Sequence, residues 1–147
     1  MLDTLYSQIG AILWLGVCAF ALAKGDRPER LAAGALVIAW LATLAIHRET
    51  DLGVGTIVMM GVEVCLFAVF LGLGWKTDRT WPIWAAGFQA ITIMVYIVTL
   101  IDLRIRAIAY ISAQTVGTYG VLICLAVGTF WAWQTREAIK PRDGDLV

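Results

Sequence analysis

One carboxylate stands in the middle of a long apolar segment of the sequence. Glu63 lies eleven residues from Leu52 and eleven from Gly74, and it is the only charged residue in that stretch. If the stretch crosses a bilayer, the carboxylate lies near the centre, where an ionised side chain costs at least about 2.5 kcal/mol. We therefore expect Glu63 to face other helices or a partner subunit, and to be protonated or to have polar neighbours.

The next apolar segment carries polar side chains at helical spacing. Gln89, Thr92, Tyr96 and Thr99 follow Ala85 at intervals of four, three, four and three residues, which places them on one face of a helix. The last apolar segment adds Gln114, Thr118 and Tyr119. The candidate intramembrane polar site is therefore predicted to contain Glu63, Gln89, Thr92, Tyr96 and Tyr119.

Two interpretations of this site remain open. In the first, Glu63 is a proton or cation site with Gln89, Thr92 and Tyr96 as its relay or coordination shell. In the second, Glu63 is a protonated carboxyl whose hydrogen bonds hold helices in register. No lysine or arginine lies inside any predicted span, so Glu63 has no intramembrane counter-ion in its own chain.

Other chemistry has little support in the sequence. His47 is the only histidine, whereas a bis-histidine haem needs two and a zinc site needs three or four ligands. The cysteines Cys18, Cys65 and Cys124 have no paired spacing and are expected to pack as small apolar residues. No hydrolase or phosphate-binding motif is present. We therefore predict no metal, no cofactor and no enzymatic activity, and zero net charge gives no reason to expect nucleic acid as a partner.

The elements that must position Glu63 are membrane spans. The 147 residues are 61% hydrophobic and 15% charged, and the charges fall in short islands between apolar runs of about twenty residues, the length that crosses a bilayer. Without period-two alternation, such runs are helices. The sequence thus predicts an all-α integral membrane protein, a single five-helix bundle with spans at about 5–23, 31–46, 52–74, 81–101 and 107–133 and a polar tail at 134–147.

The distribution of basic residues predicts the orientation. Five spans place eight lysines and arginines on one side and three on the other, and the richer side is usually cytoplasmic. The N-terminus is then outside and the C-terminus inside. The eight are Lys24, Arg27, Arg30, Lys76, Arg79, Arg136, Lys140 and Arg142; the three are Arg48, Arg104 and Arg106. Tryptophans agree with this orientation, since Trp75, Trp81, Trp84, Trp131 and Trp133 fall at the predicted inner interface.

Small residues predict a close helix contact. The second span carries Ala32, Ala35, Ala39 and Ala42 at spacings of three, four and three, a pattern that allows two helices to approach closely. Packing within the chain and contact with another subunit are both compatible with this stripe. Gly117, Gly120 and Gly128 are expected to have a similar role in the fifth span.

Two functional classes follow from these features. The sequence favours a non-catalytic accessory subunit of a larger membrane complex, because the chain has no internal repeat and no second intramembrane charge. The alternative is a small oligomeric transporter or channel-type protein that uses Glu63. In either case we expect a multi-pass protein of a bacterial inner membrane, with the lipid bilayer and either further copies or larger subunits as its partners.

Overall fold

Five α-helices make up the computed structural model, which describes residues 2–49, 52–101 and 107–140. The described residues contain no strand, so the predicted all-α class is confirmed. The helices are α1 (Leu2–Lys24), α2 (Arg27–Glu49), α3 (Leu52–Lys76), α4 (Trp81–Ile101) and α5 (Ala107–Ile139).

Four of the described helices are long and apolar enough to cross a membrane. Their apolar segments are Arg27–Ile46, Val54–Lys76, Trp81–Ile101 and Ile108–Ile139. The described apolar segment of α1, Gln8–Lys24, is shorter. Large aliphatic side chains cover the outside of the helices, with Ile12 and Ile38 both 68% exposed. A surface of this kind is stable in lipid and would be an aggregation hazard in water, so the chain is a membrane protein.

Helix α2 begins at Arg27, four residues before the expected start of the second span. The backbone N–H of Asp26 donates to the Glu29 carboxylate at 3.0 Å, the pattern of a capping box. Pro28 lies in the first turn, where its missing N–H costs nothing. The basic segment before residue 31 is thus part of the helix rather than a loop.

The far end of α5 also extends beyond the expected span, since the helix continues to Ile139. The first part of the predicted polar tail is therefore helical. The rest of that tail, from residue 141, lies outside the described residues, as do Asp102, Arg104 and Arg106.

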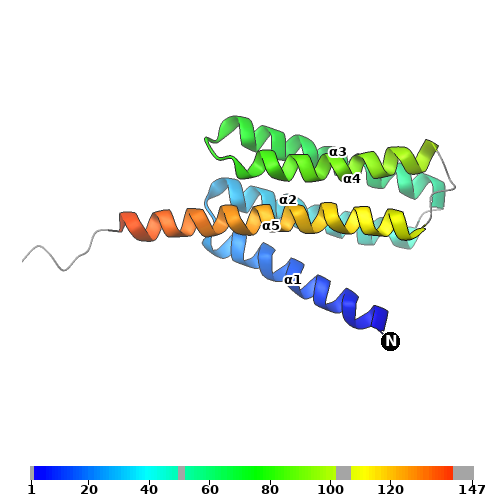
Figure 1. Cartoon of the computed structure of the whole chain (residues 1–147), viewed down its shortest axis with the longest axis horizontal. Coiled ribbons are helices and arrows are strands. Elements are labelled where there is room, and N and C mark those ends of the chain that lie inside the picture. The colour runs from blue at the N-terminus through cyan, green and yellow to red at the C-terminus, as the bar shows by residue number, and fades with distance from the viewer. Residues whose placement is uncertain (1, 50–51, 102–106, 141–147) are drawn as a thin grey trace, which may run out of the picture.

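The helices form an up-and-down bundle in which α3 packs on α4, α4 on α5, and α1 and α2 on each other and on α5 (Figure 1). Two glycines allow α5 to approach α4 closely. A Cβ atom at Gly117 would overlap the Thr92 side chain, and one at Gly120 would overlap the ring of Phe88. Helix α1 joins the bundle at its C-terminal half and diverges toward its N-terminus (Figure 1).

The apolar core lies toward one end of the bundle. Phe70, Leu125, Ala21 and Ala85 are completely buried there. The same end contains the turns that join α1 to α2 and α3 to α4, and the C-terminal end of α5 (Figure 1). We call it the charged end, and define it by residues 24–30, 75–80 and 136–140.

The predicted alanine stripe is turned toward the other helices of the same chain. Ala32 is fully buried, Ala35 and Ala39 pack against the core, and Ala42 is half-buried. The packing partners of α2 in the structure are α1, α3 and α5. Among described residues this face of α2 therefore has its neighbours within the chain.

Candidate functional site

The Glu63 side chain, on α3, meets Gln89 of α4. The Gln89 amide Nε2 donates to the Glu63 carboxylate and also lies 3.5 Å from the Glu63 backbone oxygen. Gln89 is 3% exposed. The sequence predicted that these two residues would share one site, and the structure brings them into direct contact.

A cavity of about 190 Å³ lies beside this pair. Every helix of the bundle contributes to its wall, so the space is a product of the whole fold rather than of one helix pair. The lining residues are Trp14, Leu36, Ala39, Trp40, Thr43, Val62, Glu63, Leu66, Gln89, Thr92, Thr118, Val121 and Leu122.

Two of the other predicted site residues lie elsewhere. Tyr96 is buried but does not line the cavity; its hydroxyl accepts a 3.0 Å hydrogen bond from Gln114 Nε2, and its ring packs edge-on against Tyr110 at 6.0 Å. Tyr119 is turned toward α1, where a Cβ atom placed on Gly10 would lie 3.0 Å from its hydroxyl. Thr92, by contrast, does line the cavity.

These placements follow from helix geometry. Tyr96 lies one turn beyond Thr92 on the same face of α4, so it reaches the next layer of α5. Tyr119 follows Thr118 by one residue, which rotates its side chain by about 100° around the helix axis. The site that the structure assembles is therefore Glu63, Gln89 and Thr92, with Thr118 and Thr43 as further polar neighbours.

Glu63 has no ion-pair partner among the described residues, where each salt bridge involves Arg79 or Arg136. Its polar neighbours in the cavity wall are an amide and threonine hydroxyls. The indoles of Trp14 and Trp40 pack against each other in the same wall, with ring centroids 5.4 Å apart. A carboxyl in such surroundings can bind a proton, or it can hold a cation that aromatic faces also favour.

A second polar cluster, at the charged end, was not predicted. The guanidinium of Arg79 lies 2.8 Å from the Asp26 carboxylate and 3.2 Å from that of Glu29. The indole N–H of Trp81 donates to Glu29 at 3.0 Å, and Arg136 approaches Asp26 at 3.3 Å. This charged cluster joins the α1–α2 turn, the α3–α4 turn and the end of α5.

Glu29 is the centre of the charged cluster. Its side chain is completely buried, and its carboxylate accepts bonds from Asp26, Arg79 and Trp81. Trp81, which the sequence placed at an interface with four other tryptophans, does not face outward, because it is 7% exposed and its indole N–H donates to Glu29 inside the protein. The D-x-x-E spacing at residues 26–29 is a sequence signal that could have identified the helix start.

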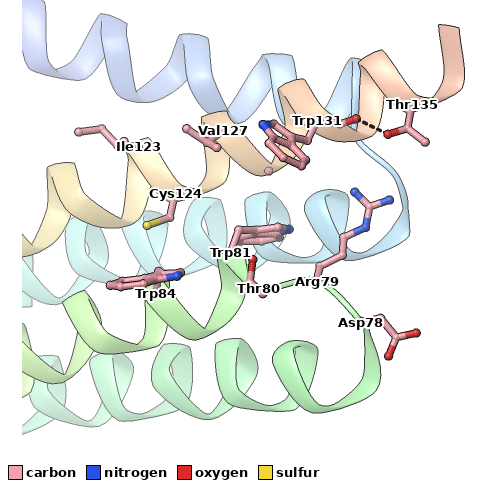
Figure 2. A pocket seen from close by; sticks show the side chains of 11 residues that line it. Asp78, Arg79, Thr80, Trp81, Trp84, Ile123, Cys124, Val127, Trp131 and Thr135 are labelled. Atoms are coloured by element: carbon pink, nitrogen blue, oxygen red, sulfur yellow. Dashed lines mark hydrogen bonds between the residues drawn. The ribbon is translucent and has the colours of Figure 1, made fainter. Parts of the chain in front are cut away.

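An open groove lies beside this cluster, between α4 and α5 (Figure 2). Its volume is about 530 Å³. Tryptophan rings form much of its wall, and polar groups gather at one end. The lining residues are Asp78, Arg79, Thr80, Trp81, Trp84, Ile123, Cys124, Val127, Gly128, Trp131 and Thr135.

Comparison with family models, curated proteins and solved structures finds no match to this chain. The described residues contain no group of three histidine, cysteine or acidic side chains that could hold a metal ion. The three cysteines are free thiols. Glu63 and its surroundings are therefore the basis on which a function is proposed.

Proposed function

We propose that this protein is a small transport-type membrane protein that binds a proton or a small cation at Glu63. The observation that carries the proposal is a carboxyl that borders a cavity formed by all five helices and has neutral polar neighbours. A carboxyl used only to hold helices together has no need of open space beside it, since a close-packed neighbour would serve equally well.

The cavity also gives the proton or cation room to move. A volume of about 190 Å³ accommodates several water molecules, and Thr43, Thr92 and Thr118 supply hydroxyls that can bind them. Helix α1 diverges from the bundle on the side away from the charged end (Figure 1). We propose that access to Glu63 is from that side, because the charged end is closed by buried side chains.

The proposed topology has five spans, with α1 as the first. It places the charged end in the cytoplasm, the N-terminus outside, and the protein in a bacterial inner membrane. The excess of basic residues at the charged end supports this orientation. Cysteines introduced one at a time at Asp145 and Glu49 test it, since only the second should react with an impermeant reagent on intact cells. Labelling of both from the same side would contradict five spans.

The function is tested by measuring proton and cation flux in liposomes that contain the purified protein. Glu63→Gln keeps the size of the side chain and most of its hydrogen bonding but removes its charge. We expect this variant to lose flux while its unfolding temperature is unchanged. Glu137→Gln is the matched control, because Glu137 is exposed near the end of α5.

Two results would contradict the proposal. The first is wild-type flux equal to that of empty liposomes for protons, Na⁺ and K⁺ alike. The second is a Glu63→Gln variant with wild-type flux. In either case Glu63 would be a structural hydrogen-bonding group, and the accessory-subunit alternative would be preferred.

That alternative, a non-catalytic subunit of a larger membrane complex, has one observation in its favour. The residues Gly61, Cys65, Ala68 and Gly72 of α3 are spaced by four, three and four, and all are exposed. A Cβ at Gly61 or Gly72 would meet nothing within 4 Å. Such a face permits close approach of another transmembrane helix, so we propose it as the contact with a further copy or with a larger subunit.

Cys65 offers a direct test of the α3 face. In a variant that carries Cys18→Ala and Cys124→Ala, oxidation in native membranes should cross-link Cys65 to a second copy if the protein is a homo-oligomer. Stable co-purification of larger polypeptides in mild detergent would instead support the accessory subunit. A protein that remains monomeric and co-purifies with no other polypeptide would contradict both proposed contacts of the α3 face.

A further inference from the structure

The groove between α4 and α5 is polar at one end and apolar at the other, as a site for an amphipathic ligand would be. Arg79, Thr80 and Thr135 lie at one end of it, and Ile123 and Trp84 lie toward the other (Figure 2). The polar end is at the charged end of the bundle, while the apolar end is deeper along the helices. From Thr135 to Ile123 the groove follows twelve residues of α5, or about 18 Å at 1.5 Å per residue.

The floor of the groove is fixed by packing and hydrogen bonding. Trp81 lies against Gly128, where an added Cβ would be 2.6 Å from the indole. The indole N–H is held by the buried carboxylate of Glu29 at 3.0 Å. Because both sides of this ring are constrained, the groove is built into the fold rather than produced by a loose side chain.

The walls of the groove are open to the surroundings of the helices. Trp84 is 68% exposed and Trp131 is 69% exposed, while Val127 is 49% exposed. These residues belong to helices that are long and apolar enough to span a membrane, so their exposed faces meet lipid. The ligand that enters such a groove comes from the bilayer.

The net positive charge of the charged end favours a lipid with an anionic headgroup. Within the charged cluster, Asp26 and Glu29 are balanced by Arg79 and Arg136. The remaining charged residues of the charged end, of which only Asp78 lines the groove, leave an excess of three positive charges around it. They are the cations Lys24, Arg27, Arg30, Lys76 and Lys140 and the acids Asp78 and Glu137. Asp78 is the one acid in the groove lining, and its carboxylate is turned outward from α4 and α5 (Figure 2).

We infer that the α4–α5 groove is a binding site for one anionic phospholipid, with its phosphate at Arg79, Thr80 and Thr135 and an acyl chain along Trp84, Cys124 and Val127. The inference concerns a surface separate from the Glu63 cavity and does not depend on the proposed function. The exposed tryptophans of the groove, Trp84 and Trp131, also support a bound lipid, because an amphipathic ring is stable beside lipid headgroups.

Native mass spectrometry of the full chain in mild detergent tests this site. The protein is mixed with equal amounts of phosphatidylglycerol and phosphatidylcholine that have identical acyl chains. We expect a single bound phospholipid with about a fivefold preference for phosphatidylglycerol, the ratio for one favourable charge contact near a membrane surface. The preference should decrease at high salt.

Matched variants locate the bound lipid. Val127→Phe fills the groove, whereas Val116→Phe makes the same change at an exposed position of α5 outside it. Trp131→Ala removes a wall, whereas Trp75→Ala removes an exposed tryptophan that does not line the groove. The first member of each pair should lose at least half of the bound phosphatidylglycerol, and the second should keep it.

Two outcomes would overturn the inference. Equal binding of the two lipids would mean that the groove holds only bulk lipid without headgroup selection. Equal retention by Val127→Phe and Val116→Phe would place the bound lipid elsewhere on the protein. Since the substituted positions are exposed, loss of the fold is not expected to obscure either result.

Discussion

Glu29 and Glu63 are both carboxyl groups within the helix bundle, yet their surroundings are opposite. Glu29 is completely buried at the charged end, and it is bonded to an arginine, an indole and a backbone N–H. Glu63 is half-buried in the middle of α3, and it is bonded to an amide beside an open cavity.

The two carboxyl groups differ in how far their charge is compensated by neighbouring groups. The buried charge of Glu29 is compensated by a cation and several donors, and loss of any of these partners would leave it unpaired. A carboxyl with neutral neighbours has no cation to hold it in the charged form. This lack of a cation is why we propose Glu63, and not Glu29, as the group that exchanges a proton or a cation.

The largest expected effect comes from breaking the compensation of Glu29. Arg79→Ala leaves a buried carboxylate without its cation, and the free energy of unfolding should fall by about 3–5 kcal/mol. Thermal unfolding in detergent measures this, with Lys76→Ala as the control for loss of an exposed charge. The combined variant Glu29→Gln with Arg79→Gln should recover much of the loss. Equal unfolding temperatures for Arg79→Ala and Lys76→Ala would contradict a structural role for Glu29.

A smaller effect is expected from moving the indole that supports Glu29. Gly128→Ala places a Cβ 2.6 Å from the Trp81 ring, and the overpacking should cost about 1–3 kcal/mol. Gly87→Ala is the matched control, because Gly87 is an exposed residue of α4 and a Cβ there meets nothing within 4 Å. We expect the control to be neutral or slightly stabilising, since alanine favours the helix. The prediction is wrong if both variants unfold at the same temperature.

The smallest effect is expected at Glu63 itself. Glu63→Leu and Gln89→Leu each remove the hydrogen bond between the two side chains, and such bonds within membranes average about 0.6 kcal/mol, with a maximum of about 1.7. The double variant should be no less stable than the worse single variant, because both changes remove the same interaction. If Glu63→Leu or Gln89→Leu lowered the free energy of unfolding by more than about 3 kcal/mol, as expected for Arg79→Ala, Glu63 would be as important for stability as Glu29. That result would contradict the difference drawn between the two glutamates.

The sequence predicted those parts of the molecule that depend on local periodicity. Apolar run lengths located all five helices to within a few residues at most ends, and helical spacing placed Gln89 and Thr92 on the face that meets Glu63. These predictions needed only the rise and twist of one helix at a time.

The parts that were missed depend on contacts distant in sequence. Arg79 lies 50 residues from Glu29, and neither residue has a local pattern that reveals the other. Trp81 was expected at the interface because most terminal tryptophans of membrane helices are found there. Tyr119 was assigned to the Glu63 site because it lies near the middle of the last apolar segment, but the rotation of α5 turns it toward α1.

The spacing of the charged cluster has a consequence for how the chain is made. Glu29 is synthesised 50 residues before Arg79, and at 5–20 residues per second its cation arrives roughly 3–10 s later. During that interval the carboxylate has only one of its partners in the folded protein, the nearby backbone N–H of Asp26. Because an uncompensated carboxylate is costly to bury, water has to solvate Glu29 until Arg79 arrives. The bundle can close its charged end only after α3 has been made, and Arg136 completes the cluster when the last helix emerges.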